Sequence, residues 1–359
     1  MRTGEEQALR RKIGDLNAYC GFEDFVYNDG PARGMRAFRL YNGQGTELTV
    51  LADRGLDIPY LSFKGQQLGF VSKTGLKSPA LYAEDGARGF LRQFYGGLLT
   101  TCGISYAGAA YEEGGQSYGL HGPFSNTPAQ RVAARALDLG GERVLEVSGE
   151  IRQSQVFSEN LVMNRRLLLY TERNRLLVTD RVENQGFIKS PLMLVYHINF
   201  GYPMLDAGAR VYSSAKAIRP RDENARLGMA RWNVMDEPSA DRPEECFFHT
   251  GSAKAGFAML HNPSLGVAAA IRYDAALLPL LCEWKCMREG DYALGLEPTT
   301  SSVMGRKQAR EDGILQYLLP GEQREFSLEL ELLDKAEDIR ALVQGAAQGK
   351  DLPGPIERA

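Results

Sequence analysis

The sequence predicts an all-β, mainly antiparallel fold with a few short helices, and two patterns carry this prediction. Short stretches alternate apolar and polar side chains, as in FSLELEL at residues 326–332, which is the period of a half-buried strand. Turn signals rich in glycine and asparagine separate these stretches, and helical patterns are marginal. This succession suits one large antiparallel sandwich better than a βαβ fold.

The elements follow in order along the chain. Apolar side chains with helical spacing predict a helix over residues 5–18 and another over 336–348. Between them lie hairpin-like stretches from Met35 and a glycine-rich loop region at 73–97. No internal repeat and no linker rich in proline or serine is present, so a single domain over 1–359 is expected. Longer strands are predicted at 143–152, 161–170, 176–182, 191–200, 256–260, 267–273, 277–286, 292–296 and 326–332.

Charge and composition limit the classes of partner that the protein is expected to bind. The chain carries 42 basic and 45 acidic residues, well mixed, for a net charge of −3. A nucleic-acid or membrane-surface partner would favour a basic face, so neither is expected, and a small neutral or weakly charged ligand fits better. No run approaches the roughly 18 apolar residues of a membrane span. The N-terminus lacks the apolar core of a signal peptide and the five cysteines are scattered, so we expect a cytoplasmic protein.

Side chains that could take part in catalysis lie in three polar segments, GLHGPFSNTPA at 119–129, YHINFGY at 196–202 and GLEPTTS at 295–301. In the second segment, strand alternation puts His197 and Asn199 on the face opposite the apolar side chains. In the third, Glu297 shares its face with two small residues, which leaves room for a ligand beside the carboxylate. The structural alternatives are a surface turn around His121, a hydrogen-bonded half-buried His197 and a solvated strand end at Glu297.

Several common chemistries lack their motifs. The sequence has no phosphate-binding glycine-rich loop, no Gly-x-Ser-x-Gly and no His-Glu-x-x-His. A zinc site with Cys282 and Cys286 is disfavoured because they would stand about 13 Å apart along one strand. The remaining possibility is a histidine that acts as the acid and a carboxylate that acts as the base, without a cofactor or metal. Interconversion of the anomers of a free sugar needs such a pair. A metal held by His121, His197 and Glu297 stays an alternative.

These motifs resemble those of a known family. The segments NGQGTELTVLADRGLDI, FYGGLLTTCGI, YGLHGPFSNTPA, YHINFGYP and WKCMREGDYALGLEP are similar to segments of the galactose mutarotase-like superfamily, which contains the aldose 1-epimerases. Within it, the chain resembles the domain-of-unknown-function 4432 group, near the deoxyribose mutarotases. The resemblance covers about residues 34–332 and implies a β-supersandwich. It implies an isomerase that interconverts the α and β anomers of a free aldose, or a non-catalytic carbohydrate-binding protein on the same scaffold.

The resemblance also assigns residues to roles. It makes Glu297 the general base, His197 the general acid and His121 a sugar-binding histidine. Further contacts with a small-molecule sugar are expected from Arg92, Lys285 and Asn126.

Other residues have competing interpretations. The sugar-binding aspartate of the superfamily has two candidate counterparts, Asp206 and Asp236. Trp284 is expected to pack in the core rather than to stack on a sugar. Arg54 and Asp57 are at least as well explained by a structural ion pair or turn as by a role in a pocket.

Two further expectations concern alternative activity and assembly. A lyase or glycosidase that uses Glu283 and Glu297 as paired carboxylates ranks behind the mutarotase. A homodimer could form through an exposed sheet edge. The sequence does not indicate which sugar is bound or whether sugar phosphates are accepted.

Overall fold

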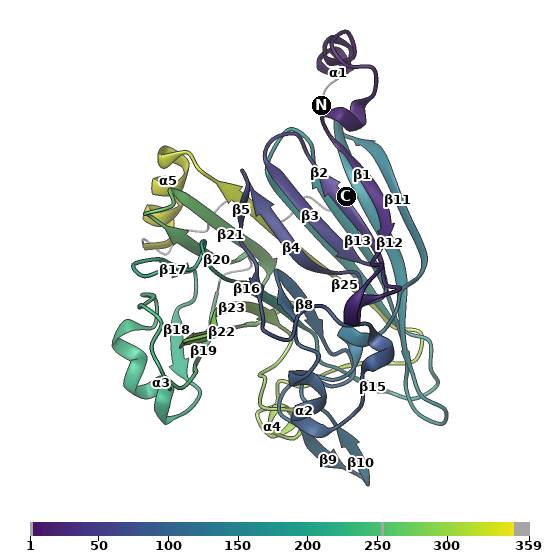
Figure 1. Ribbon diagram of the computed structural model, residues 1–359. Helices are drawn as coiled ribbons and strands as arrows, with labels where there is room; N and C mark the ends of the chain where they lie inside the picture. The colour runs from purple at the N-terminus through teal and green to yellow at the C-terminus, as the bar shows by residue number, and fades with distance from the viewer. Residues whose placement is uncertain (1–2, 253–254, 348–359) are drawn as a thin grey trace.

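Two large antiparallel sheets face each other in the computed structural model, which describes residues 3–252 and 255–347 (Figure 1). Side chains from both sheets meet in one hydrophobic core. Leu48 and Val50 enter it from the first sheet, and Leu145 and Leu167 enter it from the second. The fold is therefore all-β and mainly antiparallel, as the alternating sequence predicts.

The first sheet carries the candidate site. Its strands are β1 (Gly21–Val26), β2 (Arg36–Tyr41), β3 (Thr46–Leu51), β4 (Asp57–Phe63), β5 (Gln66–Gln67), β8 (Leu99–Cys102), β16 (Val195–Phe200), β18 (Ala217–Pro220), β19 (Glu245–Thr250), β22 (Leu280–Arg288) and β23 (Asp291–Thr299). Within the described residues they run in the order β1-β2-β3-β4-β8-β16-β23-β22-β19-β18, with β5 beside β4. Segments far apart in sequence thus become neighbours at β8, β16 and β23.

The second sheet backs the first. Its strands are β11 (Gln130–Leu139), β12 (Glu142–Ser154), β13 (Asn160–Tyr170), β14 (Arg175–Asn184), β17 (Arg210–Ser213), β20 (Ala255–Asn262), β21 (Val267–Asp274) and β25 (Gln323–Leu333). Within the described residues their order is β11-β12-β13-β14-β25-β21-β20-β17. Three short ribbons pair β6 (Phe70–Val71) with β7 (Gly96–Gly97), β9 (Tyr111–Glu113) with β10 (Gln116–Tyr118), and β15 (Ser190–Leu192) with β24 (Gln316–Leu318).

One predicted strand is two strands in the structure. The stretch 191–200 is divided between β15, which pairs with β24, and β16, which joins the first sheet. The break falls at Met193 and Leu194, whose backbone N–H groups donate to Ile104 O at 2.8 Å and to Thr300 Oγ1 at 2.9 Å. These two bonds turn the chain from one sheet into another, which alternation alone does not indicate.

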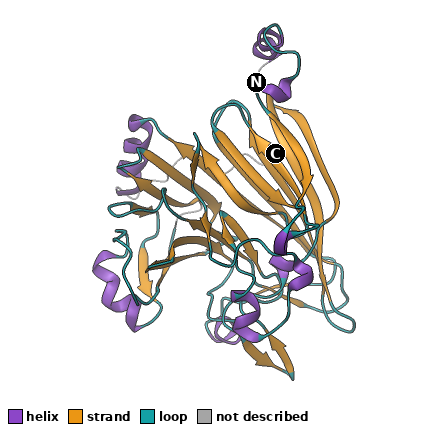
Figure 2. Cartoon of the chain, in the orientation of Figure 1, coloured by secondary structure: helices purple, strands orange, loops and turns teal. Residues whose placement is uncertain are grey.

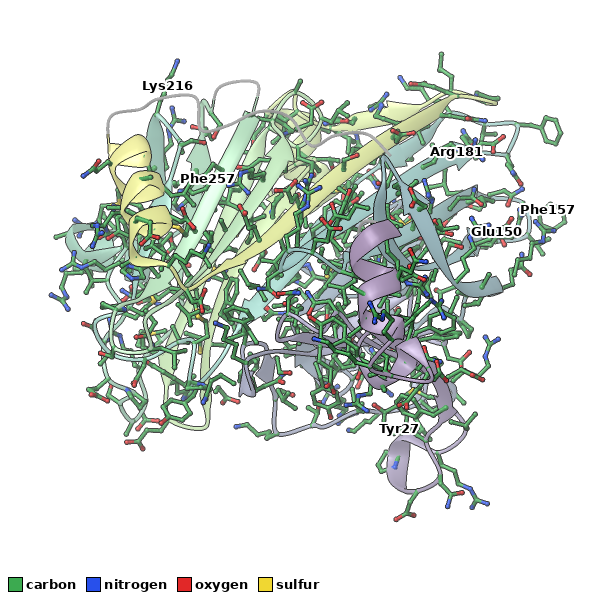
Figure 3. All side chains as sticks on the ribbon, turned by 90° about the horizontal axis from the view of Figure 1, so that it is seen from above. Tyr27, Glu150, Phe157, Arg181, Lys216 and Phe257 are labelled. Atoms are coloured by element: carbon green, nitrogen blue, oxygen red, sulfur yellow. The ribbon has the colours of Figure 1, made fainter. Side chains whose placement is uncertain are left out.

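The helices are short and lie at the periphery of the molecule (Figure 2). They are α1 (Thr3–Arg10), α2 (Gly86–Leu91), α3 (Glu223–Gly228), α4 (Arg306–Glu311) and α5 (Ala336–Ala347), with 3₁₀ turns η1 (Leu16–Ala18), η2 (Gly30–Ala32), η3 (Pro79–Leu81), η4 (Phe124–Asn126) and η5 (Met229–Arg231). Helix α5 packs Ile339 and Leu342 on Phe257 of the second sheet (Figure 3). In the described residues, no helix is both long and apolar enough to cross a membrane.

The helix expected over residues 5–18 is shorter than predicted. It ends at Arg10, and Leu16 belongs to the separate turn η1. Asp15 caps this turn, because its side chain accepts from the Asn17 N–H at 3.0 Å. A glycine followed by a capping residue therefore interrupts the helical stripe.

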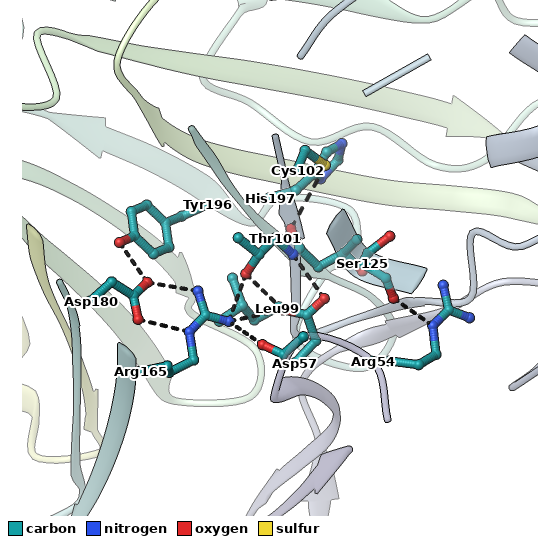
Figure 4. A network of polar contacts seen from close by, with 12 residues as sticks. Arg54, Asp57, Leu99, Thr101, Cys102, Ser125, Arg165, Asp180, Tyr196 and His197 are labelled. Carbon is teal, nitrogen blue, oxygen red and sulfur yellow. Dashed lines mark hydrogen bonds and ion pairs between the residues drawn. The ribbon is translucent and has the colours of Figure 1, made fainter. Parts of the chain in front are cut away.

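A buried ionic network joins the two sheets (Figure 4). Arg165 on β13 donates to Asp180 on β14, with Nε and Nη2 at 2.8 Å and 2.7 Å, and its Nη1 lies 3.1 Å from Asp57 on β4. Asp180 also accepts from the Tyr196 hydroxyl on β16 at 2.8 Å. Asp57 accepts from the backbone and hydroxyl of Thr101 on β8 at 3.0 Å and 2.6 Å. The network thus ties the second sheet to three strands of the first.

Arg54 and Asp57 are both buried structural residues, each with its own partners. Arg54 donates to the carbonyl oxygens of Ser125 at 2.8 Å and Gln93 at 3.1 Å, and lies 4.7 Å from the ring centre of Tyr95. Burial raises the pKa of Asp57 to about 7, against the opposing effect of nearby Arg165. Neither side chain lines the cavity described below.

The network predicts a large loss of stability when its cation is removed. In Arg165→Met, Asp180 and Asp57 are left buried without their counter-ion, so the free energy of unfolding should fall by roughly 3–5 kcal/mol. Arg226→Met removes an exposed arginine paired with Glu223 and serves as the control, with little expected change. Urea unfolding measures both variants. Equal stability of the two would contradict a network that holds the sheets together.

Candidate functional site

A cavity of about 830 Å³ opens beside β16, β22 and β23 of the first sheet. This volume lies within the range of small-molecule sites, about 300–1,000 Å³. Its polar groups include His121, His197 and Glu297, which the sequence singles out. The three come from a loop and two neighbouring strands, so the fold brings together residues that are far apart in the chain.

His197 and Glu297 meet across neighbouring strands. Strands β16 and β23 are antiparallel, with Ile198 opposite Leu296. His197 precedes Ile198 and Glu297 follows Leu296, so these two residues lie side by side on the neighbouring strands. Nε2 of His197 lies 3.2 Å from Oε1 of Glu297, and both side chains are buried. A histidine and a carboxyl group therefore lie close together on the face of the sheet that lines the cavity.

Asn199 fixes the orientation and tautomer of His197. Its amide nitrogen donates to His197 O at 2.9 Å and Gly96 O at 3.4 Å, so its Oδ1 faces Nδ1 of the imidazole at 2.5 Å. Because this oxygen can only accept, Nδ1 carries a proton. Nε2 is then the nitrogen that exchanges a proton on the cavity side, facing Glu297.

The carboxylate of Glu297 folds back over Gly295. A Cβ built at Gly295 would lie 2.4 Å from Oε1 of Glu297 and 3.2 Å from Cβ of Trp284. The small neighbour that the sequence places beside Glu297 therefore provides the space that its carboxylate occupies. A larger residue at 295 would push the carboxylate away from His197.

His121 projects into the cavity from a tightly held loop. Its backbone is left-handed, with φ of 60°, and is anchored by bonds to Gly108 O at 2.8 Å and from the Gly103 N–H at 3.0 Å. The next residue, Gly122, also has positive φ, and a Cβ there would meet Tyr106 O at 2.5 Å. The ring centre of His121 lies 5.8 Å from that of His197, and its Nδ1 has no hydrogen-bond partner among the described residues.

Burial sets the protonation of these three groups. It lowers the pKa of His121 to about 4, and burial together with nearby His121 lowers that of His197 to about 3. Burial, with a smaller contribution from Glu244, raises the pKa of Glu297 to about 8. At neutral pH the pair thus holds one proton, mainly on Glu297, while both imidazoles are neutral.

Aromatic rings surround the acid–base pair. Phe94 lies 5.2 Å and Trp284 5.6 Å from the ring centre of His197, and Phe90 stacks on Phe94 at 5.0 Å. The indole N–H of Trp284 donates to Glu244 at 2.7 Å. The expectation that Trp284 packs in the core is wrong, because it is only half-buried and lines the cavity. Strand alternation on β22 could have indicated that Trp284 faces the cavity. Cys282 lies directly opposite Glu297, and Trp284, two residues further along the strand, points to the same side.

Six charged side chains also line the cavity. Arg221 donates to Glu244 at 2.8 Å, and Lys73 donates to Asp291 at 2.8 Å. These four residues line the cavity together with Arg242 and Arg288. The sequence motifs indicate neither the two phenylalanines nor these charged residues, because the fold brings them together from segments far apart in the chain.

Metal-binding geometry is absent from the described residues, where no group of three or more His, Cys, Asp or Glu side chains is arranged to hold a metal ion. Cys282 and Cys286 lie on the single strand β22, as expected, and are free thiols.

Comparison with known proteins places the chain in a family. Residues 32–332 match the family described as Domain of unknown function (DUF4432). The chain belongs to the DUF4432 family. A search of the curated proteins found no match.

Solved structures share the fold of this DUF4432 protein. A candidate aldose 1-epimerase from Klebsiella pneumoniae has a TM-score of 0.87 at 24% identity, covering 100% of this chain and 98% of that one. A galactose mutarotase-like protein from Clostridium acetobutylicum has a TM-score of 0.61 at 16% identity, covering 89% and 100%. The galactose 1-epimerase from Lactobacillus acidophilus has a TM-score of 0.58 at 15% identity, covering 88% and 99%.

Three residues expected to contact substrate lie away from the cavity. Arg92 is exposed at the end of α2 and pairs with Asp85 at 3.3 Å. Lys285 projects from the face of β22 opposite Trp284, and its Nζ donates to Arg231 O at 2.8 Å. Asn126 is buried in the turn η4. None of the three lines the cavity, because packing of the loops and strand alternation direct them elsewhere.

The carboxylates considered as alternatives also lie outside it. Glu283 is buried on the other face of β22, where it is 2.9 Å from His249 Nε2. Asp236 pairs with Arg242 at 3.0 Å, and Asp206 accepts from a backbone N–H. A pair of catalytic carboxylates formed by Glu283 and Glu297 is therefore inconsistent with the structure.

The clash at Gly295 predicts a coupled effect on stability. Gly295→Ala should lower the free energy of unfolding by roughly 1–3 kcal/mol, because the new methyl group overlaps Oε1 of Glu297. In a Glu297→Ala background the overlap is gone, so the same change should cost less. Urea unfolding of the double-mutant cycle measures the difference, with Gly14→Ala, where a Cβ meets nothing within 4 Å, as the control. Additive effects would contradict the folded-back position of the carboxylate.

Proposed function

We propose that this DUF4432 protein is an aldose 1-epimerase, or mutarotase, that acts on a free aldose or a close derivative. The observation that carries the proposal is the buried His197–Glu297 pair, 3.2 Å apart on the wall of a cavity and holding one proton at neutral pH. Anomer exchange needs one group that accepts a proton and one that donates a proton. It needs no nucleophile, and the pair supplies both groups.

The proposed reaction transfers two protons between the pair and the sugar, one in each direction. Transfer across the pair gives a Glu297 carboxylate and a His197 imidazolium, whose Nδ1–H stays bonded to Asn199. Glu297 takes the proton of the anomeric hydroxyl while Nε2 of His197 donates its proton to the ring oxygen. The bond between the anomeric carbon and the ring oxygen breaks and leaves an aldehyde. After the carbonyl rotates, the ring oxygen attacks its other face and both protons return.

Other cavity groups would bind the sugar. His121 offers an imidazole nitrogen without a partner among the described residues, which suits a hydrogen bond with a sugar hydroxyl. The aromatic side chains offer apolar surface for the C–H face of the ring, and Glu244 fixes the plane of Trp284. Because the side chains of His197 and Glu297 are buried, hydrogen bonds to the carboxylate and imidazolium are stronger there than in water.

Anomer exchange tests the proposal directly. Saturation-transfer NMR on glucose, galactose, fucose, ribose and deoxyribose should show acceleration for at least one sugar. Glu297→Gln and His197→Asn should each lower the rate by roughly a hundredfold or more, because each removes one proton-transfer group. Glu289→Gln, an exposed glutamate on the turn after β22, is the matched control and should keep the rate.

Two outcomes would contradict the proposal. No acceleration with any sugar, alongside measurable sugar binding, would indicate the non-catalytic carbohydrate-binding protein. Acceleration that survives in both variants would place the chemistry on other residues.

A further inference from the structure

We propose that the substrate is the reducing end of a neutral oligosaccharide, with its first sugar unit at His197 and Glu297 and its second unit at the outer end of the cavity. The outer end is formed by Lys73, Arg288 and Asp291, which all line the cavity. The inference names a substrate class for the same site and rests on the proposed mutarotase function. It starts from the length of the cavity.

The cavity extends along β22 well beyond the acid–base pair. Its floor contains four alternate residues of this strand, which point to the same side: Cys282, Trp284, Cys286 and Arg288. Cys282 lies opposite Glu297 on β23, and Arg288 lies opposite Asp291. The six residue steps from Cys282 to Arg288 correspond to roughly 20 Å at the rise of a strand.

One sugar unit is too short to fill this length. A pyranose ring with its hydroxyl groups spans about four single bonds, or roughly 6 Å. A ring whose anomeric carbon lies at Glu297 therefore reaches about as far as Trp284, two residues along the floor. The part of the cavity beside Cys286 and Arg288 is left for a second unit.

The polarity of the cavity gives the direction of the extension. On the other side of Glu297 the lining is apolar, because Phe90 and Leu120 pack with Val195, which is paired with Thr299. A second sugar unit carries several hydroxyl groups, and an apolar wall leaves buried hydroxyl groups without partners. The charged outer end supplies such partners, so the chain of sugar units extends toward it.

The outer end presents a donor beside an acceptor. Nζ of Lys73 lies 2.8 Å from Oδ2 of Asp291, and both side chains are partly exposed. This contact uses one of the three N–H groups of the ammonium and leaves further acceptor sites on the carboxylate. Neighbouring hydroxyl groups of a sugar each donate and accept, so they can bond to both members of the pair.

The pairing of the charges favours a neutral sugar over an anionic one. Each of the four cations that line the cavity contacts a carboxylate: Arg221 with Glu244 at 2.8 Å, Arg242 with Asp236 at 3.0 Å, Arg288 with Asp241 at 3.1 Å, and Lys73 with Asp291 at 2.8 Å. A phosphate or carboxylate on the substrate would lie beside these anions and compete with them for the cations. Hydroxyl groups bond to a pair without separating it.

Trp284 lies on the floor between the two sugar positions. It is half-buried, and its indole N–H donates to Glu244 at 2.7 Å, which fixes the plane of the ring. The exposed part of the ring offers apolar surface to the C–H groups of a sugar. A second unit that continues past this ring comes within reach of Asp291 and Lys73.

Anomer exchange of reducing disaccharides tests the inference. Saturation-transfer NMR compares maltose, cellobiose and lactose with glucose, and galactobiose with galactose. For at least one disaccharide, kcat/KM should exceed that of its reducing-end monosaccharide by roughly tenfold or more, because the second unit adds charge-assisted hydrogen bonds. Asp291→Asn and Lys73→Met should each lower this ratio roughly three- to tenfold. Lys64→Met, which removes an exposed lysine paired with Asp334 outside the cavity, is the matched control and should keep the ratio.

Calorimetric binding of the same sugars separates this inference from the proposed function, because binding needs no turnover. If no sugar is exchanged, but a disaccharide binds roughly tenfold more tightly than its monosaccharide and Asp291→Asn loses this gain, the two-unit site stands and the mutarotase function fails. If monosaccharides are exchanged but no disaccharide is bound or exchanged better than its monosaccharide, the function stands and the inference is overturned. A higher kcat/KM for glucose 6-phosphate than for every disaccharide would also overturn it, in favour of an anionic substrate.

Discussion

The ionic contact of Arg165 with Asp180 and Asp57 is the constraint on which the site depends, because it fixes the middle strands of one sheet against the other. Three members of the network come from the first sheet, and one of them is Tyr196. Alternation along β16 then has two consequences. The Tyr196 side chain points into the core toward Asp180, and His197, the next residue, points the opposite way into the cavity. The position of the histidine is thus set from behind the sheet.

The cavity combines burial with a small number of polar groups. Burial alone makes a charged His197 and a charged Glu297 costly, and it shifts their pKa values in opposite directions. Contact between the two lets them share one proton without a net charge. Asn199 holds the imidazole of His197 in place through Nδ1. The pair therefore resembles a preorganised proton relay more than a structural ion pair.

Much of this arrangement follows from sequence, and the reasons for the rest are physical. Alternation predicts the sheets, the shared face of His197 and Asn199, and the open space beside Glu297. It does not predict that the strand over 191–200 divides between sheets, since that depends on bonds to residues far away in the chain. The aromatic and charged side chains of the cavity come from helix α2, strands β22 and β23 and several loops, and tertiary packing brings them together.

Errors in the expected site have the same origin. The surroundings of Lys285 in sequence suggest a group near the base, but alternation on β22 turns it away and brings Trp284 in instead. Arg92 lies close in sequence to Phe90 and Phe94, which do line the cavity, yet the end of α2 directs its side chain to solvent. Position along the chain identifies the neighbourhood, and the register of each element decides which side chain enters the cavity.

The proton shared by His197 and Glu297 is the central claim, and ¹⁵N NMR of histidine-labelled protein tests it most directly. The His197 signals are those missing in His197→Asn. We expect a neutral imidazole with its proton on Nδ1 from neutral pH down to about 4, with protonation only toward its pKa of about 3. An imidazole that titrates near its ordinary pKa of 6.5, or that carries its neutral-state proton on Nε2, would contradict the shared proton.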